Sequence, residues 1–164
     1  MTRLFFALVA FCLAPGICDA QTYPPTYVEP DGREWTCYAP PGFTGDVVPV
    51  AGINGYANGF WGFATYNASG WPVIIFDTSQ LQNMPTIVVR FVYYHECAHL
   101  SVPTTNEIEA NCYGLIEMRD AGDITESEEE VLRESHYALP QLPPQYGGSG
   151  RYFWDATIEC AGIY

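Results

Sequence analysis

Residues 85–112 read PTIVVRFVYYHECAHLSVPTTNEIEANC, and this stretch carries the clearest structural pattern of the chain. Its first half is mostly apolar, and Pro85 suits the first turn of a helix. The many β-branched residues lower helix propensity, so burial must stabilise such a helix. Pro103 stops it. We therefore expect a buried helix over 85–100 and a second helix over 107–119 that turns back beside it.

Two histidines lie four residues apart on the first of these helices. His95 and His99 would project from the same face, where both imidazoles can bind one metal ion. Glu96 lies between them and could act as a general base on a water at that ion. Imidazole and carboxylate ligands suit zinc. The pattern therefore predicts a Zn²⁺ site with Glu96 as the catalytic residue.

A catalytic zinc site needs a third protein ligand and one open position. The nearest candidates are Glu107 and Glu109, at the start of the second helix. With Glu107 as the ligand, Asn111 lies four residues on and could orient a ligand histidine. Glu109 would project from a different side of the helix and is the rival ligand. His136 is the remaining histidine and lies far downstream.

The two motifs at 95–99 and 107–111 together resemble the zinc-binding core of gluzincin-type metallopeptidases. In these enzymes His-Glu-x-x-His is followed, on a later helix, by Glu-x-x-x-Asp or Glu-x-x-Ala-Asp/Asn. The chain is most similar to small exported bacterial proteins that carry a His-Glu-Cys-x-His motif. It differs from the usual pattern because Asn111 stands in place of Asp and only seven residues separate the two motifs.

The resemblance implies a zincin-like fold in which His95, His99 and Glu107 bind zinc and Glu96 is the catalytic base. It also implies hydrolysis of peptide bonds in a peptide or protein substrate. The alternative function is that of a non-catalytic protein of the cell envelope, in which zinc only stabilises the structure. A closed shell with a fourth protein ligand such as His136 would indicate this alternative.

The charge of the chain excludes one class of partner. The 164 residues include 19 acidic side chains against six arginines, and the formal net charge is −13. A nucleic-acid-binding protein needs a basic surface to neutralise phosphates, so we expect no nucleic-acid partner. Hydrophobic residues make up 48% of the chain, which is enough for one folded domain.

The first twenty residues have the layout of a secretory signal peptide. Arg3 supplies a positive start, Leu4 to Leu13 is apolar, and the small residues Cys18 and Ala20 precede a cleavage position. We therefore expect residues 1–20 to be removed and residues 21–164 to form the zinc-peptidase-like domain. This predicts an exported protein, periplasmic or extracellular, with no membrane span in the mature chain.

The mature chain would hold four cysteines, an even number that indicates two disulfides in an exported domain. Of the three possible connectivities we favour Cys37–Cys160, which would join the two ends of the domain, and Cys97–Cys112, which would join the two motif helices. The rival interpretation is that Cys97 and Cys112 bind zinc as thiolates.

The remaining segments indicate an α+β fold with a short sheet and about three helices. The β-branched run Val73–Asp77 predicts the best strand, either at the edge of the substrate cleft or inside the core. Thr125 and Glu128 have the spacing of a capping box, so a third helix is expected over 125–135. The segment 138–150 is rich in proline and glycine and is expected to be loop.

Two further groups of residues are functional candidates. The aromatic residues of the glycine-rich segment 54–71 could line a sugar- or peptide-binding surface, but such residues more often build a core. Peptide hydrolysis also needs a group that stabilises the oxyanion. The candidates for this role follow the third helix: His136, Tyr137, Tyr146 and Arg151.

Overall fold

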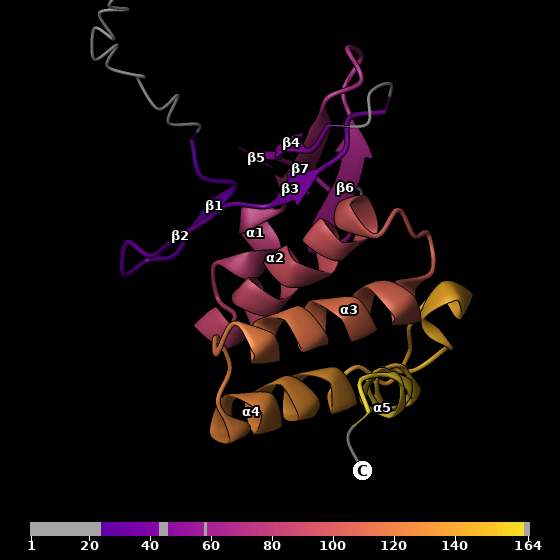
Figure 1. The fold of residues 1–164 in the computed structure, drawn as a ribbon. Coiled ribbons are helices and arrows are strands. Elements are labelled where there is room, and N and C mark those ends of the chain that lie inside the picture. Colours follow the sequence, from indigo (N-terminus) through magenta and orange to yellow (C-terminus); the bar gives the residue numbers. More distant parts are fainter. Residues whose placement is uncertain (1–23, 43–45, 58, 163–164) are drawn as a thin grey trace, which may run out of the picture.

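A computed structural model describes residues 24–42, 46–57 and 59–162. The predicted signal peptide, residues 1–20, lies outside the described residues. Small sheets come first along the chain and helices follow, so the predicted α+β class is confirmed (Figure 1). In the described part, no helix combines the length and apolar character needed to cross a membrane.

Three small sheets form the N-terminal part of the described chain. The strands β1 and β2 form an antiparallel pair, and so do β3 and β4. The third sheet has the order β5-β7-β6, with β5 parallel and β6 antiparallel to the central β7. The bounds are Tyr27–Val28, Glu34–Trp35, Tyr38–Ala39, Val48–Pro49, Ala51–Asn54, Gly62–Tyr66 and Pro72–Phe76 for β1 to β7.

The run expected at Val73–Asp77 forms β7, and it is the central strand of its sheet. Four of its five residues are buried, as expected for a β-branched segment with neighbours on both sides. It is therefore a core strand. The strand at the edge of this sheet, next to helix α2, is β6.

Helix α2, Thr86–Ser101, is the first motif helix and lies between the sheet and the other helices (Figure 1). Thirteen of its sixteen residues are buried, which explains how a segment rich in β-branched residues is stable as a helix. Pro85 is its N-cap, and Val102 caps its C-terminus just before Pro103.

The second and third predicted helices are also confirmed. Helix α3 spans Glu107–Asp120, and the Asn106 side chain caps it by accepting from the amides of Ile108 and Glu109. Helix α4 spans Glu126–Tyr137, and Thr125 and Glu128 form the predicted capping box.

Helix α5, Gly150–Cys160, was not expected from the sequence. It begins at the N-cap Ser149 and buries Phe153 and Trp154 against the core. Two short elements complete the described chain: α1, Thr78–Leu81, and the 3₁₀ helix η1, Pro144–Tyr146. The described residues thus hold five α-helices rather than about three.

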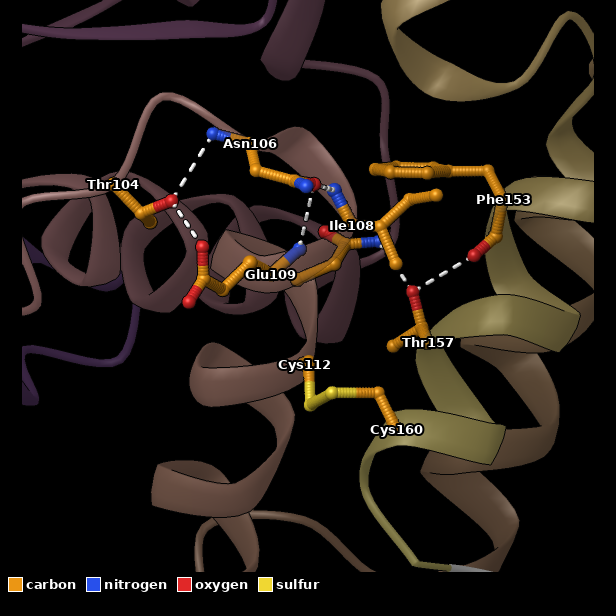
Figure 2. The surroundings of a disulfide bond; sticks show 9 residues. Thr104, Asn106, Ile108, Glu109, Cys112, Phe153, Thr157 and Cys160 are labelled. Carbon is orange, nitrogen blue, oxygen red and sulfur yellow. Dashed lines mark hydrogen bonds between the residues drawn. A yellow bond between two sulfur atoms is a disulfide. The ribbon is translucent and has the colours of Figure 1, made fainter.

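The described residues form two disulfides, as predicted, but the favoured pairing was wrong. The bonds join Cys37 to Cys97 and Cys112 to Cys160. Cys97 follows His95 by two positions, so it lies about 200° around the helix axis from His95, whose side of α2 packs on α3. Cys97 therefore bonds to Cys37, the residue before β3, and not to a cysteine on α3. Cys112 and Cys160 join α3 to α5 (Figure 2), and all four thiols are oxidised, which excludes them as zinc ligands.

Candidate metal centre

The side chains of His95, His99 and Glu107 meet where the C-terminal half of α2 faces the start of α3. The Nε2 atoms of the two histidines are 3.0 Å apart. Glu107 Oε2 lies 3.2 Å from His95 Nε2 and 3.3 Å from His99 Nε2. One nitrogen or oxygen atom from each of the three residues thus faces the same point.

The close approach of α3 to α2 depends on Gly114. A Cβ atom at this position would lie 3.0 Å from the backbone nitrogen of His95 and 3.0 Å from the carbonyl carbon of Tyr94. Such contacts are tighter than side chains ordinarily make, so glycine allows the two helices to pack closely beside His95.

The orientation of the His95 ring follows from a chain of hydrogen bonds. The Thr157 hydroxyl donates to the carbonyl of Phe153 at 2.8 Å (Figure 2). Its proton is thus used, and the hydroxyl oxygen accepts a hydrogen bond from Asn111 Nδ2 at 3.1 Å. The Asn111 amide is thereby oriented with Oδ1 toward His95 Nδ1, at 2.7 Å. His95 Nδ1 must therefore donate, and the lone pair of its Nε2 points to the centre of the cluster.

The His99 ring is oriented in the same way by the loop between α2 and α3. Its Nδ1 lies 2.8 Å from the carbonyl oxygen of Thr104, which only accepts hydrogen bonds. The Nε2 atom of His99 therefore also presents a lone pair, next to that of His95 and the Glu107 carboxylate. Three acceptors that face one another repel unless a proton, shared in a hydrogen bond, or a metal ion lies between them.

The spacing of these atoms suits a tetrahedral metal ion. Ligand bonds of about 2.0–2.1 Å at tetrahedral angles place ligand atoms about 3.3 Å apart. The observed separations of 3.0, 3.2 and 3.3 Å fall close to this value. The three side chains are 11–18% exposed, so the centre keeps an accessible side.

The pKa values of the cluster reflect the same attraction for positive charge. Burial opposes ionisation of Glu107, but its hydrogen bonds with His95 and His99 outweigh this and lower its pKa to about 2. Burial likewise lowers the pKa of His99, while Glu107 and the Thr104 carbonyl raise it, with a net increase above the ordinary value. The Glu107 carboxylate is thus ionised and able to bind a cation.

Glu96 is buried beside the cluster, under strand β6. Burial raises the pKa of its carboxyl group above the ordinary value, although His95 and His99 act in the opposite direction. Gly62 on β6 leaves the space that this side chain occupies, since a Cβ there would lie 2.8 Å from Glu96 Oε1. The carboxyl group is therefore held next to the centre without belonging to it.

The two rival ligands lie elsewhere. Glu109 accepts a 2.5 Å hydrogen bond from Thr104 Oγ1 (Figure 2) and does not belong to the cluster of His95, His99 and Glu107. His136 is buried, and its Nδ1 donates to the carbonyl of Leu132 at 2.7 Å. Among the described residues, the cluster that could bind a metal consists of His95, His99 and Glu107.

A cavity adjoins this centre, and Tyr146 brings a hydroxyl group to it. His95, Glu96 and Tyr146 are among the lining residues. Burial, and then the Glu107 and Glu96 carboxylates, raise the pKa of the Tyr146 phenol, so it remains a hydrogen-bond donor at neutral pH.

The other candidates for oxyanion stabilisation lie away from the centre. The Tyr137 hydroxyl donates to Asp155 at 2.6 Å, and the Arg151 guanidinium lies over the Tyr137 ring. Of the four residues proposed after the third helix, Tyr146 and His136 line the cavity.

The aromatic residues of segment 54–71 do not form one buried group. Trp61 packs against the core and lines the cavity. Phe63, Tyr66 and Trp71 are 40–46% exposed. The hydroxyl group of Tyr66 also donates to the carbonyl of Pro40.

Comparison with family models gave no match to this chain, and comparisons with curated proteins and with solved structures gave none either. The resemblance to gluzincin-type peptidases therefore depends on the motif residues of the sequence.

Proposed function

We propose that the protein is an exported zinc-dependent metallopeptidase. One observation carries this proposal: the convergence of two imidazole lone pairs and one carboxylate, beside a buried glutamate, at an accessible point. Structural zinc sites use four protein ligands, whereas catalytic sites use three and leave one position open. Three protein ligands with a nearby general base fit a catalytic zinc site.

His95, His99 and Glu107 would hold the zinc ion. Zinc bound there would polarise a scissile carbonyl group and lower the pKa of water toward neutrality. Glu96 takes the proton of the attacking water and passes it to the leaving amine. The raised pKa of this buried carboxyl group supports the proton transfer, because a group that titrates nearer to neutral pH both accepts and releases a proton.

Tyr146 is the residue of this chain best placed to stabilise the oxyanion. Its ring is held between Phe60, at 6.3 Å, and Phe153, at 5.2 Å between ring centroids. Its hydroxyl interacts with Glu107, close to where the substrate carbonyl would lie. A donor fixed before the reaction stabilises developing negative charge without reorganisation.

Two further features agree with a peptide substrate and with export. Strand β6 is at the edge of its sheet, beside the helix that carries Glu96, where an extended peptide could add as a further strand. The two disulfides are typical of a protein that folds in an oxidising compartment.

The first test is native mass spectrometry of the folded protein, with zinc counted per chain. We expect one zinc ion in the wild type and loss of most of it in Glu107→Ala. The matched control, Glu109→Ala, removes a carboxylate from the same helix turn and should retain zinc. Zinc retained in Glu107→Ala, or absent from the wild type after reconstitution, would contradict the ligand assignment.

The second test concerns the base. Glu96→Gln should retain zinc and lose cleavage of a mixture of peptides, since the amide cannot accept the proton of water. Turnover by the variant at the wild-type rate would refute the role of Glu96. A wild-type protein that binds zinc but cleaves no peptide would instead favour the alternative, a zinc-stabilised protein without catalytic activity.

A further inference from the structure

The cavity beside the candidate metal centre has a volume of about 240 Å³ and mostly apolar walls. Phe60 from the segment before β6, Phe91 from α2, Phe153 from α5, and Leu139 and Leu142 after α4 contribute to these walls. An apolar cavity of about 150 Å³ is large enough to bind benzene. The cavity thus has room for a substituted aromatic ring.

The buried side chain of His136 brings a polar ring nitrogen to these mostly apolar walls. It is only 4% exposed, and the rings of Phe91, Phe153 and Trp154 pack around it. Its Nδ1 donates to the Leu132 carbonyl, so Nε2 carries a lone pair. Within the described residues, Nε2 has no hydrogen-bond partner, while the side chain lines the cavity.

This acceptor atom is not fully enclosed by protein atoms, so a donor that enters the cavity can form a hydrogen bond with it. Burial lowers the pKa of His136 to about 4, so the ring is neutral at physiological pH and stays an acceptor. Other polar groups around the cavity have assigned roles: Glu96 and His95 face the metal centre, and Asn111 orients His95.

We propose that this cavity receives the side chain of a substrate residue next to the scissile bond, and that its preferred occupant is tyrosine, whose hydroxyl donates to His136 Nε2. The apolar walls would cover the ring, and the histidine would distinguish tyrosine from phenylalanine. This inference rests on the proposed peptidase function for its biological meaning, but the binding property belongs to the cavity alone.

The property can be measured without zinc or turnover. The probes are p-cresol, which has the ring and hydroxyl of tyrosine, and 4-methylanisole, in which a methyl ether replaces the hydroxyl donor. Both are titrated into the EDTA-treated, disulfide-bonded protein by NMR. We expect p-cresol to bind about three- to tenfold more tightly than 4-methylanisole and to shift the ¹⁵N signal of His136 Nε2.

Variants of His136 test the acceptor directly. His136→Leu should weaken p-cresol about tenfold and leave toluene as tight or tighter, because the hydroxyl would be buried without a partner. His136→Gln places an amide oxygen in the cavity and should recover part of the difference. Equal binding of p-cresol and 4-methylanisole by the wild type, or no binding of either, would overturn the proposal even if the leucine variant does not fold.

The outcome is distinguishable from the fate of the proposed function. Selective p-cresol binding by a protein that cleaves no peptide would support the cavity and refute the peptidase. Peptide cleavage with no preference for tyrosine on either side of the bond, together with no p-cresol binding, would retain the peptidase and overturn the cavity proposal.

Discussion

The buried imidazole of His136 should make the folded protein sensitive to mild acid. Its side chain packs between the rings of Phe91 and Trp154, and burial lowers its pKa from 6.5 to about 4. Between these two values the unfolded chain binds a proton and the native chain does not. Stability therefore rises with pH in this window and is lost as the pH falls from about 6.5 toward 4.

The magnitude follows from the size of the shift. A pKa difference of one unit corresponds to about 1.4 kcal/mol, so a decrease from 6.5 to about 4 corresponds to about 3 kcal/mol over the full window. At pH 4.5 most of this should already be lost, roughly 2.5 kcal/mol relative to pH 8. This is a large fraction of the stability of a small domain.

The assay is urea unfolding of the EDTA-treated protein at pH 8 and pH 4.5, with His136→Phe as the comparison. Phenylalanine keeps an aromatic ring in the core but has no titratable group. The carboxylates and the raised pKa of His99 affect both proteins equally, so the wild type should lose about 2–3 kcal/mol more than the variant on acidification. Parallel losses in both proteins would refute the reasoning.

Two further predictions concern Asn111 and the disulfide between α3 and α5. Asn111→Ala should lower zinc affinity about 10–100-fold, because His95 Nδ1 loses its acceptor, whereas Asn111→Asp should retain most of the affinity. Competition with a chromophoric chelator measures both affinities, and equal affinities of the wild type and the alanine variant would contradict this role. Replacing Cys112 and Cys160 by alanine should lower the free energy of unfolding in urea by about 4 kcal/mol, because their bond closes a sequence separation of 48 residues. An unchanged midpoint, or another partner for Cys112 in a non-reduced digest, would contradict the pairing.

Local patterns in the sequence were sufficient for three of the five described α-helices and for the central strand β7. Helix α2 was predictable because apolar residues continue through it and prolines flank both ends, and α4 was predictable from its capping box. Helix α5 was missed because the glycine- and proline-rich segment before it suggested that the loop continued to the end of the chain. The signal that could have revealed it is Ser149, an N-cap residue followed by buried aromatic residues three or more positions later.

The disulfide pairing was not predictable, since it depends on which helix face meets which neighbour. Cys97 and Cys112 lie on adjacent helices, yet each points away from the other helix and bonds to a more distant segment. Sequence spacing gives the angle between Cys97 and His95 around the helix axis, but it does not say which elements lie on each side.

Some features of the candidate metal centre were likewise predictable from the sequence, and others were not. The sequence alone determined that His95 and His99 share a helix face and that a carboxylate follows within a short loop, because a spacing of four residues is a property of the helix itself. Only the tertiary structure placed Glu107, rather than Glu109, beside the two histidines, oriented their rings, and formed the cavity that His136 lines. These features depend on the close packing of α3 and α5 against α2, where contacts between residues distant in sequence determine the position of every side chain.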